Sequence, residues 1–141
     1  MGFQVGNIIK SLYAKLSSDS TLIALTPRIY VSKAPKSATY PYIVIGDNDF
    51  LERPFNVFGK KGKETQVSIY VYDSTRSDLT NISIAERIDT VLDWKDDLSI
   101  TGNNHIKTAI QRSNVGYELN NAEGTELRFI ELQYLITTDE A

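Results

Sequence analysis

The segment "ETQVSIYVYD" at residues 64–73 constrains the fold most, because its side chains alternate strictly in character. Val67, Ile69 and Val71 fall on one side of an extended chain, and Ser68 between them falls on the other. This period of two residues is typical of a β-strand with one buried face, whereas a helix would scatter the same residues around its circumference. The sequence therefore predicts a sheet whose apolar face must be covered by a second layer.

Two segments repeat apolar residues at helical spacing and are predicted to supply that layer. The first helix is predicted over residues 3–19, and its apolar stripe consists of Val5, Ile8, Ile9, Leu12, Tyr13 and Leu16. The second helix is predicted over residues 74–94, and its apolar stripe consists of Leu79, Ile82, Ala85, Ile88, Val91 and Leu92. Between them, residues 22–25 are predicted to form a short turn that ends before Pro27. Trp94, at the end of the second helix, is expected to plug the core or a sheet edge.

Four further segments have the composition of strands. They are "RIYVSKAP" at 28–35, "ATYPYIVIGD" at 38–47, "HIKTAIQRSNVGYEL" at 105–119 and "TELRFIELQYLIT" at 125–137. In the second of them Pro41 is predicted to start the strand, since proline cannot donate to a sheet ladder. The order helix, three strands, helix, two strands predicts one α+β domain over residues 1–141, with a largely antiparallel sheet of about four to five strands and two amphipathic helices packed on it.

The segment at about residues 48–63 is predicted to be a long loop or an extended hairpin arm, because it contains Pro54, two glycines and three lysines. It also contains the large apolar residues Phe50, Leu51, Phe55 and Phe58. Two interpretations stay open. These side chains either fold back on the core of their own domain or need a partner to cover them.

The charges of the chain are distributed unevenly. Residues 1–70 contain nine Lys/Arg and five Asp/Glu, whereas residues 71–141 contain six and thirteen. This asymmetry reflects either two solvated surfaces or a basic and an acidic patch suited to docking. No long basic stripe indicates specific recognition of nucleic acid.

No combination of residues predicts catalysis, a cofactor or a metal site. The sequence has no cysteine and one histidine, His105, which is expected to be an exposed polar residue at a strand start. Asp47, Asp49 and Glu52 are close together, but carboxylates at strand ends and in loops are usually only solvated. No apolar run approaches the length of about 18 residues that would indicate a transmembrane helix.

The landmarks "LYAKLSSDSTLIAL", "PRIYVSKAP", "ATYPYIVIGD", "TQVSIYVYD" and "IAERIDTVLD" follow one another in this order. In this order the chain resembles the tail completion, or tail terminator, family of long-tailed, siphovirus-like bacteriophages and related prophages. The resemblance implies a structural virion protein of the tail or neck, assembled in the host cytoplasm and without enzymatic activity. It implies a hexameric ring of identical copies that caps the head-proximal end of the tail tube and ends its polymerisation. The ring would meet the tail tube protein and the head connector or stopper, with DNA passing through its lumen without specific binding and no membrane involved.

Two sets of residues are expected at protein interfaces. The first set belongs to the basic, aromatic arm at about residues 48–63 and consists of Phe50, Leu51, Arg53, Phe55, Phe58, Lys60 and Lys61. The second set belongs to the acidic face of the second helix and consists of Glu86, Asp89 and Asp93. The alternatives are another neck or minor tail protein, such as a stopper, and a small ligand-binding α+β domain. The latter would need a pocket with converging polar groups, which the sequence does not indicate.

Overall fold

The computed structural model describes residues 5–35, 37–57, 60–73, 79–120 and 125–140. The elements are α1 (Val5–Ser17), α2 (Ser20–Leu25), β1 (Ile29–Val31), β2 (Tyr42–Val57), β3 (Lys60–Asp73), α3 (Leu79–Leu92), β4 (Asn103–Asn120) and β5 (Thr125–Glu140).

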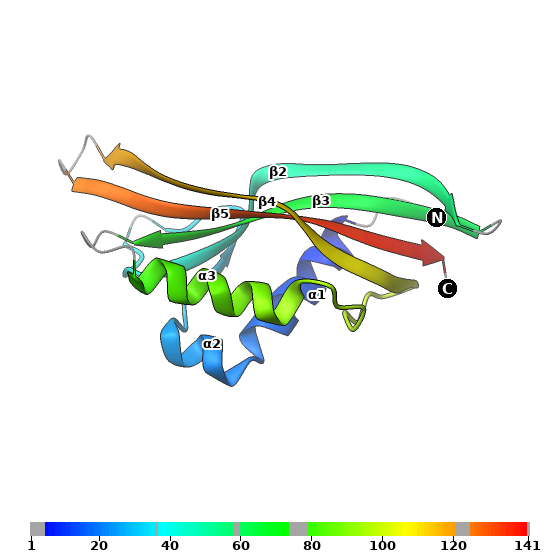
Figure 1. Ribbon diagram of the computed structural model, residues 1–141, viewed down its shortest axis with the longest axis horizontal. Coiled ribbons are helices and arrows are strands. Elements are labelled where there is room, and N and C mark those ends of the chain that lie inside the picture. The colour runs from blue at the N-terminus through cyan, green and yellow to red at the C-terminus, as the bar shows by residue number, and fades with distance from the viewer. Residues whose placement is uncertain (1–4, 36, 58–59, 74–78, 121–124, 141) are drawn as a thin grey trace.

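The described strands form one five-stranded sheet in the order β1-β2-β3-β5-β4. β1 is parallel to β2, and the other neighbouring pairs are antiparallel. The helices α1, α2 and α3 lie on one face of this sheet (Figure 1). The predicted α+β class with a largely antiparallel sheet is confirmed.

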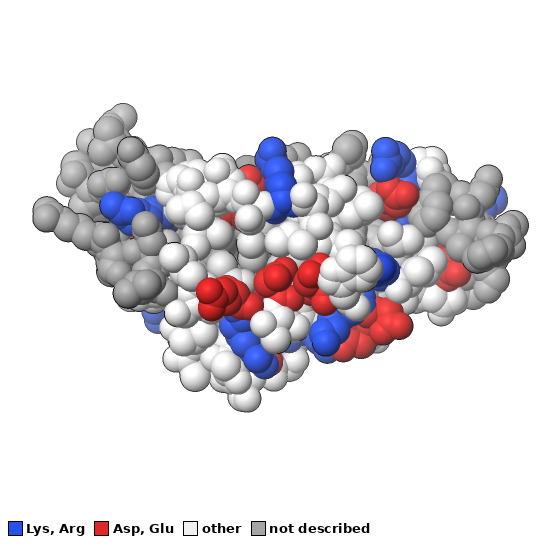
Figure 2. Space-filling model, in the orientation of Figure 1, with Lys and Arg blue, Asp and Glu red and all other residues white. Residues whose placement is uncertain are grey.

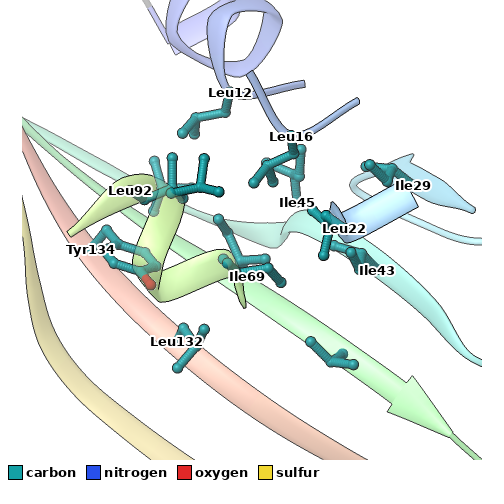
Figure 3. Close-up of a cluster of buried hydrophobic side chains, with 14 of the residues drawn as sticks. Leu12, Leu16, Leu22, Ile29, Ile43, Ile45, Ile69, Leu92, Leu132 and Tyr134 are labelled. Carbon is teal, nitrogen blue, oxygen red and sulfur yellow. The ribbon is translucent and has the colours of Figure 1, made fainter. Parts of the chain in front are cut away.

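The alternation in β3 has the predicted consequence. Val67, Ile69 and Val71 are completely buried and belong to the hydrophobic core, and Ile69 pairs in register with Leu132 of β5. On the other side of the core, α1 contributes Leu12 and α3 contributes further apolar side chains (Figure 3). α1 and α3 each turn one apolar stripe towards the sheet, so the core lies between the two layers.

The short helix α2 corrects the sequence analysis, which predicted only a turn at residues 22–25. Asp19 precedes the helix in an extended conformation, and its Oδ2 accepts a hydrogen bond of 2.9 Å from the backbone N–H of Leu22. Such an N-cap satisfies a donor that would otherwise have no partner at the helix start. Asp19, two residues after the end of α1, is therefore the N-cap of α2, whose Leu22 is completely buried.

The segment at about residues 48–63 continues two strands of the sheet. β2 and β3 stay paired as far as Val57 and Lys60, and the register shifts between Ile45 and Phe50. β1 pairs with β2 only from Ile43 to Ile45, so the part of β2 beyond the register shift is an edge among the described strands. The result is a long hairpin that extends to one end of the molecule (Figure 1).

The Tyr-Pro dipeptide before β2 is anchored to the end of α2. The Tyr40–Pro41 peptide bond is cis. The carbonyl oxygen of Pro41 accepts hydrogen bonds from the hydroxyl of Thr26 at 2.8 Å and from Nε of Arg28 at 3.1 Å. These bonds fix the start of β2 next to the chain that leads into β1.

Candidate functional site

Of the acidic residues predicted at an interface, Glu86 and Asp89 lie on α3, and Asp93 follows directly after its end. Glu86 is exposed, while Asp89 and Asp93 are half-buried. Asp89 Oδ1 accepts a hydrogen bond of 2.9 Å from the hydroxyl of Tyr134, and Asp93 Oδ1 accepts one of 2.9 Å from the backbone N–H of Ile110. Burial raises the pKa of Tyr134, and the hydrogen bond to Asp89 acts in the same direction. Figure 2 shows acidic side chains in a line over α3.

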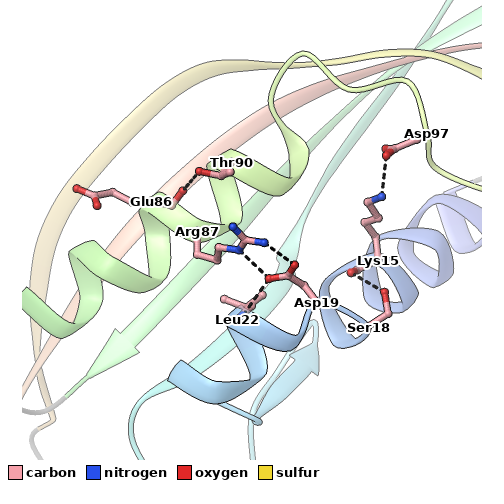
Figure 4. Close-up of polar contacts among 8 residues, drawn as sticks. All are labelled: Lys15, Ser18, Asp19, Leu22, Glu86, Arg87, Thr90 and Asp97. Carbon is pink, nitrogen blue, oxygen red and sulfur yellow. Dashed lines mark hydrogen bonds and ion pairs between the residues drawn. The ribbon is translucent and has the colours of Figure 1, made fainter.

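The cation on α3 points to a different neighbour. Arg87 forms a two-pronged ion pair with Asp19, in which Nε and Nη2 lie 2.8 Å from the two carboxylate oxygens (Figure 4). The hydrogen bond from Arg87 lowers the pKa of Asp19. Because Asp19 also caps α2, this pair joins α3 to α2.

Only some of the hairpin residues predicted at an interface have side chains that the structure describes. Arg53 and Lys61 are exposed, and Arg53 forms an ion pair with Glu64 on the neighbouring strand. Phe50, Leu51 and Phe55 belong to β2 and Lys60 begins β3, but their side chains lie outside the described part of the chain, as does the whole of Phe58.

The structure does not bring the two predicted sets together within one chain. Figure 1 shows the tip of the β2–β3 hairpin at one end of the long axis, whereas α3 begins towards the other end. Each chain therefore carries a basic hairpin and an acidic helix side as two separate surfaces, and complementary surfaces of this kind can join neighbouring copies.

Trp94 corrects a second expectation. It is 68% exposed, so it does not plug the core, and its backbone adopts a φ of 60° just after α3. Lys107 Nζ lies 3.3 Å from the centroid of its ring, which is the arrangement of a cation–π contact. Periodicity placed Trp94 on a helix end but did not reveal which way the end turns.

His105 is also placed differently from the prediction, since its ring is half-buried. The backbone N–H of Leu98 donates to Nδ1 at 3.0 Å, and Nε2 lies 2.8 Å from Oγ1 of Thr108. Burial lowers the pKa of His105. The ring closes the loop between α3 and β4, which is a structural role.

Within the described ranges, no three His, Cys, Asp or Glu residues are grouped as metal ligands would be. The side chains of Asp47, Asp49 and Glu52 lie outside these ranges. Among the described helices, none is long and apolar enough to cross a membrane.

An aromatic cluster on the sheet face opposite the helices was missed by the sequence analysis. Neighbouring rings have centroids 5.3 to 6.1 Å apart, and the members are Tyr30, Tyr40, Tyr42, Tyr70, Tyr72 and Phe129. The signal was present as tyrosines two residues apart in "YPY" and "YVY". Only the register, which pairs Tyr42 with Tyr72 and Tyr72 with Phe129, brings these pairs side by side.

Comparison with known proteins identifies the family. Residues 10–136 match the family model described as tail completion protein gp17. Among solved structures, the chain is similar to a chain in the virion of a native gene transfer agent particle, with a TM-score of 0.80, 16% identity and 99% of each chain covered. It is also similar to the gp17 protein of bacteriophage SPP1, with a TM-score of 0.54, 21% identity and 95% of each chain covered. The comparison with curated proteins gave no match. The chain therefore belongs to the tail completion protein gp17 family, a family of structural proteins of the phage virion.

Proposed function

We propose that the protein forms a hexameric ring on the head-proximal end of a phage tail tube. The ring ends polymerisation of the tube and offers the surface to which the head connector or stopper attaches. DNA passes through the lumen without specific binding, and the protein has no enzymatic activity. The observation that carries this proposal is the family match over residues 10–136, which covers most of the chain.

The distribution of chemistry over the molecule supports a ring. A closed ring of identical copies needs two different, complementary surfaces on each subunit. The exposed Lys61 of the hairpin and the exposed Glu86 of α3 mark two such surfaces. The expectation that the arm and the acidic side of α3 make protein contacts is therefore retained as part of the proposal.

The test is the mass of the purified protein by light scattering over a range of concentrations, with and without isolated tail tubes. A hexamer, free or bound to tube ends, supports the proposal, and electron microscopy of the tubes then shows which end carries it. A protein that stays monomeric and does not bind tubes contradicts the proposal. Rings that bind connectors but leave tube growth unchanged would instead support the alternative role of a stopper.

The arm can be tested in the same assay. Deletion of residues 52–61 shortens the β2–β3 hairpin at its tip, away from the core residues of β3. We expect the shortened protein to fold and to lose tube capping. Normal capping by this variant would remove the arm from the proposed interface.

A further inference from the structure

A shallow groove of about 250 Å³ lies between α3 and the strands β4 and β5. Ile130 and Leu132 line it and are almost completely buried. Ile82 of α3 and Val115 of β4 also line it, and they are 38% and 60% exposed. Large aliphatic side chains left in water next to a hollow are typical of a surface that a protein partner covers.

The border of the groove on α3 is acidic. Glu86 and Asp89 are among its lining residues, and Asp93 follows directly after the end of α3. The line of acidic side chains in Figure 2 therefore runs beside the groove. A partner that fits this site would insert apolar side chains and place cations next to them.

The tip of the β2–β3 hairpin has this chemistry. Residues 54–61 read "PFNVFGKK" and contain two phenylalanines, a valine and two lysines, with no acidic residue. Pro54 and Lys61 are exposed. The segment therefore combines large apolar side chains with a net positive charge, whereas the chain as a whole carries a net charge of −3.

A chain cannot insert its own hairpin into its own groove. The ladder between β2 and β3 holds the hairpin out to the pair Val57 and Lys60. The described end of the hairpin lies at one end of the long axis, whereas β4 runs from that side of the molecule to the opposite end (Figure 1). Ser113 and Val115 belong to the second half of β4. The hairpin that fills the groove must therefore come from a second copy. A contact between two different surfaces repeats from copy to copy, and it gives a closed ring where the rotation between copies closes.

We propose that residues 54–61 of one copy dock in the groove between α3 and the strands β4 and β5 of the next copy. This inference rests on the proposed ring and names the contact that closes it. Phe55, Val57 and Phe58 provide the apolar side chains for the groove, and Lys60 and Lys61 lie near Glu86 and Asp89. The groove is smaller than the pockets of roughly 300–1,000 Å³ that hold small molecules, which favours inserted side chains over a free ligand.

Cross-linking tests the contact directly, because the chain has no cysteine. Lys61 and Ser113 are both exposed, and Ser113 lines the groove. In the variant Lys61→Cys/Ser113→Cys, a short bis-maleimide reagent should join hairpin to groove and give a ladder of covalent oligomers up to the hexamer. Each single variant should give no product larger than a dimer. The control Lys61→Cys/Ser17→Cys places the second thiol at an exposed position on α1 and should give no ladder.

Two substitutions should block the contact from opposite sides. Val115→Arg places a long cation in the groove, and Lys61→Glu places an anion on the hairpin. Each should weaken association between copies by at least about tenfold, as for central interface residues. Val31→Arg is the matched control, because Val31 is also an exposed valine on a strand but lies on β1. Circular dichroism spectra should show all three variants to be folded like the original protein.

Mixing the two blocked variants gives the sharpest outcome. The Lys61→Glu copy keeps its groove and the Val115→Arg copy keeps its hairpin, so the mixture should form a heterodimer that cannot extend. Combining Lys61→Glu with Glu86→Lys in one chain should restore rings, and the restored contact should weaken with salt.

The outcomes separate this contact from the ring itself. Hexamers that form, free or on tubes, without the Lys61–Ser113 ladder would leave the ring intact and overturn the hairpin contact. Absence of any oligomer, with and without tubes, would overturn both. A ring that tolerates Val115→Arg and Lys61→Glu as well as it tolerates Val31→Arg would also overturn the contact.

Discussion

The same strands form both faces of the sheet, but the side chains on the two faces are buried by different kinds of contact. The face under the helices is filled by aliphatic side chains such as Val67 and Ile69. On the other face, no described helix covers the strands (Figure 1), and yet Ser68 is only 1% exposed. There, the carboxylate of Glu131 accepts hydrogen bonds from the hydroxyls of Ser68 and Tyr70, both at 3.0 Å.

The comparison shows that the first face depends on tertiary packing and the second on lateral contacts between strands. Removing a side chain from the helix face leaves a cavity. Removing Glu131 from the other face leaves the hydroxyls of Ser68 and Tyr70 without their acceptor. The two faces should therefore respond differently to substitution.

The largest effect is expected on the helix face. Ile69→Ala should lower the free energy of unfolding by about 2–5 kcal/mol, because it creates a cavity at a completely buried site of the central strand β3. Gln66→Ala, on the opposite face of the same strand, should cost less than about 1 kcal/mol. Urea titrations of both variants check this, and equal losses would contradict the difference between the faces.

The second prediction addresses the polar cluster. Glu131→Ala should cost about 1–3 kcal/mol, because it leaves the buried hydroxyl of Ser68 without its acceptor. Arg112, whose Nη2 lies 3.4 Å from Glu131, is well exposed and should contribute little of this. The same titration measures the loss. Adding Ser68→Ala to Glu131→Ala should recover part of it, and full additivity of the two changes would argue against a coupled cluster.

A smaller effect on stability is expected from the hydrogen bond between Tyr134 and Asp89, which lies on the helix face of the sheet. Tyr134→Phe removes the hydroxyl that donates to Asp89 and should lower the free energy of unfolding by about 0.5–1.5 kcal/mol. The ring stays in the core and Asp89 keeps access to water, so the loss should be below that of Ile69→Ala. Thermal unfolding of both variants in parallel checks the order, and a larger loss for Tyr134→Phe would reverse the interpretation.

The smallest effect concerns pH at the edge of the helix layer. Because burial lowers the pKa of His105 below its ordinary value of 6.5, the unfolded chain binds the proton more readily than the folded one. Stability should therefore fall as the pH drops through about 6.5, and His105→Gln should flatten this part of the curve. The pKa values of Asp19 and Asp97 are lowered from 3.8, so these carboxylates affect stability only at more acidic pH, outside the range in which His105 titrates. Urea titrations from about pH 8 to about pH 5 compare the two proteins. If the two proteins lost stability equally as the pH falls, the imidazole of His105 would not be the cause of the loss.

Periodicity in the sequence was sufficient for the fold class and for the burial of β3. A strand needs only an alternating pattern, and a covering helix needs only a stripe, so both are local properties of the chain. The ordered landmarks from residue 12 to residue 93 also indicated the family that residues 10–136 match. The short helix α2 was not predicted, because one residue, Asp19, both follows α1 and caps α2.

The tertiary structure decided which surfaces meet. Sequence spacing placed Glu86, Asp89 and Asp93 on one side of a helix, but only packing put β4 beside them and made a groove with Val115. The exposure of Trp94 and the aromatic cluster across β2, β3 and β5 likewise depend on backbone direction and strand register. These features join residues far apart in the chain, and pairing over such distances is set by the whole fold, whereas the elements themselves are set by their own residues.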